Sequence, residues 1–368
     1  MGYAEVLSGY RDVDWGRFFA SASRRHVDKV LLGQDLSPDQ FASLLSEAAG
    51  AQLEEMAERA SKETLRNFGR TIQLYTPLYI ANYCDNRCLY CGFNSANDIE
   101  RKRLSPEEVE KEAAHLSSTG IKHILILTGE SRDMSPVSYI ADCVRALCRY
   151  FPSISIEVYP LTEGEYAGLV KEGVDGLTIY QEVYDEDIYK RLHAGGPKSD
   201  YAFRLEAPER AARAGMRSVT IGTLFGLDDW RRETFLTGLH AKYLQDKFPN
   251  VEIGAAIPRM RPHAGAFKAP FEVTDKNIVQ AILALRLFLP RISLSLSTRE
   301  DARLREALVP LGITRMSAGS ITAVGGHTAA VGSGARQFEI SDERDVGEVM
   351  SMLERKGYQP VLKDWERI

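Results

Sequence analysis

Cysteine is scarce in this sequence, and the few cysteines are unevenly placed. The chain has 368 residues and five cysteines, of which three lie within eight residues and none follows Cys148. Such a set does not form the paired framework of a disulfide-stabilised secreted domain, so we expect a protein of the reducing cytoplasm. Cys143 and Cys148 lie five residues apart on one predicted helix, and we interpret both as small buried side chains.

The sequence also lacks long apolar runs and any excess of positive charge. No apolar run approaches the roughly 20 residues that a membrane-spanning helix needs. The first residues, with Arg11, Asp12 and Asp14, do not resemble a basic and then apolar leader. The net charge is −5, and the basic residues are dispersed along the chain. We therefore expect no membrane anchor, no nucleic-acid surface and a cytoplasmic location.

The cysteines that are present predict a metal-binding loop. Cys84, Cys88 and Cys91 lie between a predicted strand and a predicted helix. Thiolates are soft ligands for zinc, copper(I) or iron–sulfur clusters, and a structural zinc site would close with a fourth Cys or His. The next such residues, His115 and Cys143, are distant in the chain. Three thiolates suit a 4Fe–4S cluster whose fourth iron stays open for a ligand, with an incomplete zinc site as the alternative.

From residue 71 onward the hydrophobic pattern alternates between strands and helices, after helical periodicity in residues 12–70. Capping boxes that begin at Ser37, Ser105 and Thr162 predict helix starts. Strand followed by helix with short connections requires a parallel sheet, and eight repeats predict a closed (β/α)8 barrel, an α/β fold of the TIM type. We divide the chain into a helical extension (1–70), the barrel (71–322) and a C-terminal loop and appendage (323–368). The predicted strands cover residues 72–83, 123–128, 153–159, 176–181, 218–224, 251–257, 292–298 and 313–317.

The spacing of the three cysteines, which closes on Gly92 and Phe93, resembles the radical S-adenosylmethionine (SAM) superfamily. The resemblance implies that the methionine part of SAM chelates the fourth iron. Tyr90 and Phe93, inside the loop, are then expected to bind the cofactor.

Polar residues at the ends of the second and third predicted strands extend this expectation, because the chemistry of such a barrel lies at the carboxyl ends of its strands. Gly129 and Glu130 resemble the superfamily's Gly-Gly-Glu element, which binds the amino group of SAM, although Thr128 replaces its first glycine. A helix-capping carboxylate is the alternative for Glu130. Glu157 and Tyr159 share the parity that should face into the barrel, so we expect both to bind SAM. A structural carboxylate paired with an arginine is the alternative for Glu157.

The other strand ends predict a pocket for the substrate. Gln181 and Glu182 close the fourth strand and are expected to line the SAM or substrate pocket. Ser293, Ser295 and Ser297 fall on one face of the seventh strand, and Arg299 falls on the same face. Its guanidinium should therefore project over the barrel mouth, where it can hold a carboxylate through two contacts. A surface ion pair with Glu300 or Asp301 is the alternative. Tyr79 is expected beneath the cluster, with a place in the barrel core as its alternative.

Nearly the whole chain resembles the aromatic amino-acid lyases of the radical SAM superfamily. The resemblance implies a 4Fe–4S cluster and SAM, which together produce a deoxyadenosyl radical that takes hydrogen from the amino group of L-tyrosine. The Cα–Cβ bond then breaks to give 2-iminoacetate (dehydroglycine) and 4-cresol, and the former serves thiazole formation in thiamine biosynthesis. In this family Arg299 would hold the substrate carboxylate, Ser317 or Ser320 would assist it, and Tyr79 would contact the amine. The similar stretches begin at Pro77, Tyr180, Leu192, Gly226, Leu296 and Met316.

The resemblance also implies thiazole synthase as a protein partner and an external one-electron reductant of the flavodoxin or ferredoxin type. A related lyase that acts on L-tryptophan stays open. The tyrosine lyase of hydrogenase-cofactor maturation is disfavoured, because its C-terminal domain has a second set of cysteines. A non-catalytic electron carrier would complete its coordination shell, and a sulfur-inserting enzyme would need further ligands. Whether the glycine-rich residues 323–336 form a lid is also left open.

Overall fold

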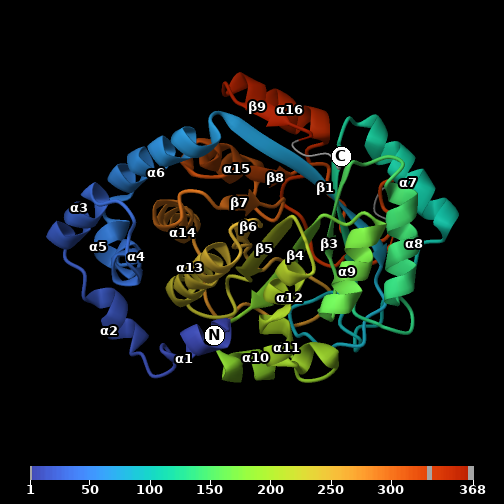
Figure 1. Cartoon of the computed structure of the whole chain (residues 1–368), viewed down its shortest axis with the longest axis horizontal. Coiled ribbons are helices and arrows are strands. Elements are labelled where there is room, and N and C mark those ends of the chain that lie inside the picture. The colour runs from blue at the N-terminus through green and yellow to red at the C-terminus, as the bar shows by residue number, and fades with distance from the viewer. Residues whose placement is uncertain (1, 330–333, 364–368) are drawn as a thin grey trace.

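Eight parallel strands close into a barrel at the centre of the computed structural model, which describes residues 2–329 and 334–363 (Figure 1). Neighbouring strands follow one another in chain order, and β1 completes the ring by pairing with both β8 and β2. The predicted (β/α)8 fold is confirmed. The barrel strands are β1 (Thr71–Ala81), β2 (His123–Thr128), β3 (Ser153–Glu157), β4 (Gly176–Glu182), β5 (Ser218–Thr223), β6 (Glu252–Ala256), β7 (Ser293–Leu296) and β8 (Arg315–Ser317).

Helices connect successive strands and cover the outside of the barrel (Figure 1). The three predicted capping boxes are all present. In each, the hydroxyl of Ser37, Ser105 or Thr162 accepts a backbone N–H three residues later, and the side chain of that later residue accepts the first residue's N–H. The connecting helices are α7 (Pro106–Ser118), α8 (Val137–Leu147), α9 (Glu163–Glu172), α10 (Glu186–Leu192), η1 (Pro197–Ser199), α11 (Tyr201–Leu205), α12 (Ala207–Arg213), α13 (Trp230–Lys247), α14 (Asp275–Phe288), α15 (Ala302–Leu308) and η2 (Val309–Leu311).

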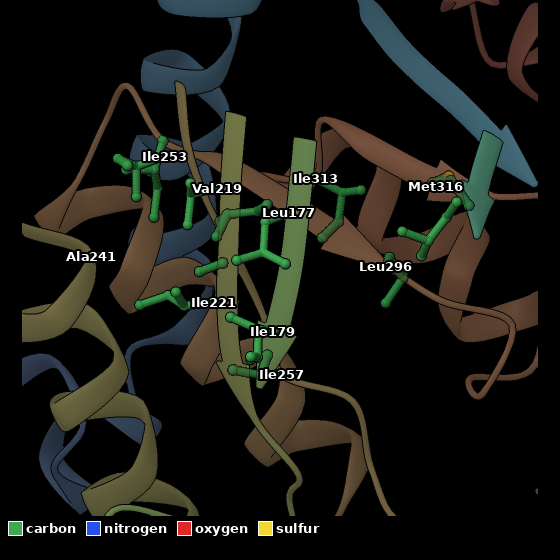
Figure 2. Close-up of a cluster of buried hydrophobic side chains, with 14 of the residues drawn as sticks. Leu177, Ile179, Val219, Ile221, Ala241, Ile253, Ile257, Leu296, Ile313 and Met316 are labelled. Atoms are coloured by element: carbon green, nitrogen blue, oxygen red, sulfur yellow. The ribbon is translucent and has the colours of Figure 1, made fainter. Parts of the chain in front are cut away.

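Alternate residues of the strands bury their side chains against these helices. Leu177 and Ile179 of β4 and Val219 and Ile221 of β5 belong to one buried cluster with Ala241 of α13 (Figure 2). The residues between them, which include threonines and a tyrosine, line small spaces inside the barrel. The period of two therefore separates an apolar outer face from a partly polar interior, as the strand patterns predict.

The N-terminal extension packs on the flank of the barrel, against α13 and α14. The ring of Phe41 stacks on that of Phe288, with centroids 4.2 Å apart, and the Tyr3 hydroxyl donates to the Leu236 carbonyl at 2.7 Å. The buried side chains of the extension and of the barrel form one continuous cluster. The first helix begins at Tyr3, earlier than the sequence pattern predicts. The extension contains α1 (Tyr3–Ser8), α2 (Trp15–Ala20), α3 (Arg24–Leu32), α4 (Pro38–Leu44), α5 (Glu47–Gly50) and α6 (Leu53–Phe68).

The C-terminal appendage consists of α16 (Val346–Arg355) and β9 (Gln359–Val361). The sequence pattern did not predict β9, which adds parallel to the start of β1 outside the ring. Of the glycine-rich residues 323–336, those from 330 to 333 lie outside the described residues. Before them, the backbone N–H groups of His327 and Thr328 donate to the carboxylate of Glu112, a fully buried residue of α7.

The predictions that Cys143 and Cys148 are both buried have different outcomes. Cys143 is buried on α8 as predicted, but the prediction for Cys148 is wrong, because this residue is the exposed C-cap of α8. Among the described residues, no helix combines the length and apolar character needed to cross a membrane.

Candidate active site

A cavity opens at the carboxyl ends of the barrel strands, where the chemistry of this fold is placed. Its empty volume, mouth included, is about 850 Å³. The predicted site residues that line it are Cys84, Cys88, Cys91, Tyr90, Phe93, Gly129, Glu130, Glu157, Tyr159, Glu182 and Arg299. The predicted residues that do not line it are Tyr79, Gln181, Ser317 and Ser320.

The cysteine loop is held in place by hydrogen bonds from distant parts of the chain. The N–H groups of Arg87 and Leu89 donate to the carbonyls of residues 195 and 192, at 2.9 and 3.1 Å. The Arg101 guanidinium donates to three carbonyls of the loop and its flanks. Burial raises the pKa of Cys88 to about 12 and also raises the pKa of Cys91. These thiols therefore keep their protons until a metal replaces them.

The aromatic side chains of the loop are also fixed. The Tyr90 hydroxyl lies 2.6 Å from Nε2 of His193, and the Lys198 ammonium lies over the Tyr90 ring, 5.5 Å from its centroid. Phe93 meets the ring of Tyr79 edge to face. The loop thus presents Tyr90 and Phe93 to the cavity in single, supported orientations.

β2 ends beside this loop in Thr128, Gly129 and Glu130. A Cβ atom on Gly129 would lie 2.3 Å from the Tyr83 carbonyl oxygen, so glycine is what allows the two backbones to approach this closely. Instead of capping a helix, the Glu130 carboxylate accepts from the Asn86 side-chain amide at 2.6 Å and binds the cysteine loop. The Thr128 hydroxyl is buried at the cavity, has no hydrogen-bond partner in the part of the chain that the structure describes, and is therefore available to a ligand.

Glu157 and Tyr159 reach the cavity from β3, as their parity predicts. Burial and the neighbouring Glu182 raise the pKa of Glu157 to about 7. Among the described residues Glu157 has no ion pair with an arginine, which disfavours a purely structural role. The Tyr159 hydroxyl donates to the Ser135 carbonyl at 2.8 Å, so this residue offers the cavity its ring rather than its hydroxyl.

A bulge at the end of β4 decides which of its polar residues face the cavity. Tyr180 pairs with Gly222 and Glu182 with the next residue of β5, so Gln181 is the additional residue and points away. The expectation that Gln181 lines the pocket is therefore wrong, whereas Glu182 lines it with a positive φ of 73°. Tyr180 also lines the cavity.

Glu182 carries the strongest charge pairing in the cavity. Its carboxylate lies 2.6 Å from the Lys198 ammonium and 3.6 Å from the Arg204 guanidinium. Burial would raise the pKa of Glu182, but the two cations outweigh it and hold the pKa below its ordinary value. Glu182 is therefore ionised at one wall of the cavity, close to Glu157, whose pKa is about 7.

Arg299 projects over the barrel mouth from the end of β7. Its guanidinium lies 3.4 Å from the centroid of the Phe338 ring, and burial lowers its pKa. Glu300, the alternative partner, is instead engaged by Arg259, whose Nε lies 3.0 Å from a carboxylate oxygen. No carboxylate in the described part of the chain forms an ion pair with Arg299. This arrangement suits a ligand that brings its own carboxylate.

The remaining predicted substrate residues stand behind the cavity wall. The Tyr79 hydroxyl donates to the side-chain oxygen of Gln337 at 2.7 Å, and Gln337 itself lines the cavity. The Ser317 hydroxyl accepts the Thr298 N–H at 3.1 Å. The Ser320 hydroxyl is buried and has no hydrogen-bond partner in the described residues.

Comparisons with known proteins place this cavity in a family. One family model, the Radical SAM superfamily, matches residues 78–237, and another, the Biotin and Thiamin Synthesis associated domain, matches residues 256–359. Over 361 residues the chain is 38% identical to the 2-iminoacetate synthase of Escherichia coli (strain K12), covering 97% of this chain and 96% of that one. The chain belongs to the 2-iminoacetate synthase family of radical SAM enzymes. The predicted enzyme class, a radical SAM carbon–carbon lyase, is thereby confirmed.

Solved structures agree with this family. The FeFe-hydrogenase maturase HydG from Carboxydothermus hydrogenoformans matches this radical SAM enzyme with a TM-score of 0.85 and 29% identity, covering 98% of this chain and 83% of that one. Methylornithine synthase (PylB) matches with a TM-score of 0.71 and 22% identity, over 91% of this chain and 97% of that one, and shows the shared fold.

The residues present fit the cofactors of radical SAM enzymes, a 4Fe–4S cluster and SAM. Cys84, Cys88 and Cys91 come from one loop and line one cavity. Three thiolates suit a cubane, in which each thiolate binds a different iron and the fourth iron stays open for a ligand. The Thr128 hydroxyl, which has no hydrogen-bond partner in the described residues, would offer SAM a donor beside the cluster.

Several residues of the site escaped sequence reasoning. Lys198 belongs to a stretch that resembles the family, but the sequence pattern assigned it no role. Asn86 and Arg204 carry no local signal, because their partners, Glu130 and Glu182, are distant in sequence. Gln337 and Phe338 follow the glycine-rich residues, in the part of the sequence that predicts an appendage, but both line the cavity.

Proposed function

We propose that this enzyme cleaves the Cα–Cβ bond of L-tyrosine to give 2-iminoacetate and 4-cresol, and that the 2-iminoacetate serves thiazole formation in thiamine biosynthesis. One observation carries the step from family to substrate. Arg299 brings a guanidinium without an ion-pair partner to the cavity, which is the group that an amino-acid carboxylate requires. The similarity to a 2-iminoacetate synthase supports the product.

In this proposal the chain's residues divide between cofactor and substrate. Glu130, Glu157 and Glu182 lie on the SAM side, where carboxylates can accept from its ammonium and ribose hydroxyl groups. When bound, the cluster and SAM supply a carbon-centred radical that can take a hydrogen atom from the substrate amine. Arg299 and its stacked Phe338 orient the substrate so that this amine faces the cluster side of the cavity.

Tyr79, Ser317 and Ser320 are assigned supporting roles at the substrate. Tyr79 contacts the amine through its phenolic oxygen, which can accept a hydrogen bond while the hydroxyl donates to Gln337. The Ser320 hydroxyl is buried without a partner in the described residues and keeps its hydrogen-bonding capacity for the carboxylate, and Ser317, three residues earlier at the end of β8, assists.

The enzyme acts on a small molecule and needs a reductant. We propose an external one-electron donor of the flavodoxin or ferredoxin type and a cytoplasmic location, where the cluster thiols stay reduced. Thiazole synthase is proposed as a physical partner, because the imine product hydrolyses in water and a direct transfer would protect it.

The test is a product analysis. The protein is reconstituted anaerobically with iron and sulfide and incubated with dithionite, SAM and either L-tyrosine or L-tryptophan. The expected products with tyrosine are 4-cresol, 2-iminoacetate and its hydrolysis product, glyoxylate, together with deoxyadenosine. Formation of 3-methylindolic acid from tryptophan, with no cresol from tyrosine, would overturn the substrate assignment.

A further inference from the structure

A short C-terminal segment, residues 336–338, docks directly on the cysteine loop. The Gly92 N–H donates to the Gln337 carbonyl at 3.0 Å, and the Gln337 N–H donates to the Thr322 carbonyl at 3.1 Å. A Cβ atom on Gly92 would lie 2.5 Å from the Arg336 carbonyl oxygen and 2.6 Å from that of Gln337. The contact is thus between two backbones, and it leaves no room for a side chain at position 92.

The Gln337 side chain joins two functional groups that lie far apart in sequence. Its oxygen accepts from the Tyr79 hydroxyl at 2.7 Å, and its nitrogen donates to the Cys91 sulfur at 3.8 Å. The two contacts use opposite ends of the amide, so the N–H group that reaches the sulfur is separate from the oxygen that accepts from Tyr79. Gln337 is half-buried and lines the cavity, whereas Tyr79 is buried beneath it.

An N–H donor on a cluster ligand has a defined electrostatic effect. Reduction of an iron–sulfur cluster by one electron increases the negative charge on its thiolate sulfurs. A hydrogen bond to such a sulfur is stronger in the reduced state, and hydrogen bonds to sulfur are among the factors that set the reduction potential. Removing the donor should therefore make reduction harder.

We propose that Gln337 is a positioning residue that raises the reduction potential of the cluster through its hydrogen bond to Cys91, while it holds the Tyr79 hydroxyl at the substrate side. The first part rests on the family's cluster and is independent of which amino acid is cleaved. The second part rests on the proposed function, in which Tyr79 contacts the substrate amine. The electron itself comes from the external one-electron reductant.

The test is a redox titration of the reconstituted full-length protein, without substrate, followed by the electron paramagnetic resonance signal of the reduced cluster. Gln337→Met and Gln337→Leu remove the N–H donor, and Tyr79→Phe removes the other hydrogen bond of the same amide. The midpoint potential is expected to become more negative in both Gln337 variants and to stay at the wild-type value in Tyr79→Phe.

Two results would overturn the proposal. One is a wild-type midpoint in a Gln337 variant with a full iron content. The other is an equal shift in Tyr79→Phe, because the shift would then follow repacking rather than loss of the N–H group. If Gln337→Leu fails to hold iron, the potential of Gln337→Met decides. A failure to produce cresol from tyrosine would not move any of these potentials, so the two proposals fail separately.

Discussion

Replacement of Arg299 by alanine should abolish most of the activity on L-tyrosine and leave the cluster intact. A hydrogen bond to a charged group contributes about 1.5–3 kcal/mol, so two of them to one carboxylate contribute about 3–6 kcal/mol. At about 1.4 kcal/mol for each factor of ten, kcat/KM should fall by about 10² to 10⁴. The loss should be at the upper end if the cavity excludes water, since the Phe338 ring covers one face of the Arg299 guanidinium.

The assay is cresol formation under anaerobic conditions, with iron content and the spectrum of the reduced cluster measured on the same samples. Arg299→Lys is the matched control, because it keeps the charge but loses the planar fork and the stacking on Phe338. Its activity should lie between those of the wild type and Arg299→Ala. A wild-type kcat/KM in Arg299→Ala, or a lost cluster in both variants, would refute the assignment of Arg299 to the substrate carboxylate.

Three further predictions concern other parts of the site and the fold. Because the pKa of Glu157 is raised to about 7, its carboxylate ionises as the pH rises through that value, and SAM affinity should increase between about pH 6 and about pH 8. The same raised pKa means that the stability Glu157 contributes at low pH is lost as the pH rises through about 7. Glu157→Gln should flatten the pH profile of SAM affinity, measured by equilibrium binding, and the pH profile of stability, measured by thermal unfolding. Gly129→Ala places a Cβ atom 2.3 Å from the Tyr83 carbonyl, so iron incorporation should drop sharply, and a normal iron content would contradict this reading. Ser105→Ala removes the N-cap of α7, which does not line the cavity. The free energy of unfolding, measured with denaturant, should fall by about 0.5–2 kcal/mol, and kcat in the cresol assay should not change.

Much of the fold followed from local patterns. The capping boxes at Ser37, Ser105 and Thr162 depend on residues three positions apart, and each was found where the sequence predicts it. The strand periodicity was equally local. β9 was missed because a three-residue strand has no periodic signal, and its pairing with β1 joins parts of the chain that are distant in sequence.

The site was predicted less evenly. Glu157 and Arg299 reach the cavity because strand parity holds up to the ends of β3 and β7. The alternation of side-chain directions is interrupted at β4, because Gln181 is a bulged residue. Gln181 therefore points away, and Glu182 lines the cavity. Ser317 at the end of β8 and Ser320 after it do not line the cavity, because parity gives the direction of a side chain but not its depth along the barrel axis.

By itself, the sequence determined the chemistry that this protein can host and the order of its elements. Three cysteines within one loop define a cluster site wherever the loop lies, and alternating strands and helices define a barrel. Only the tertiary structure decided which carboxylates are paired, which cation is left for a substrate, and that Gln337 meets both Tyr79 and Cys91. These are contacts between distant segments, and they depend on the packing of the whole chain rather than on any local pattern.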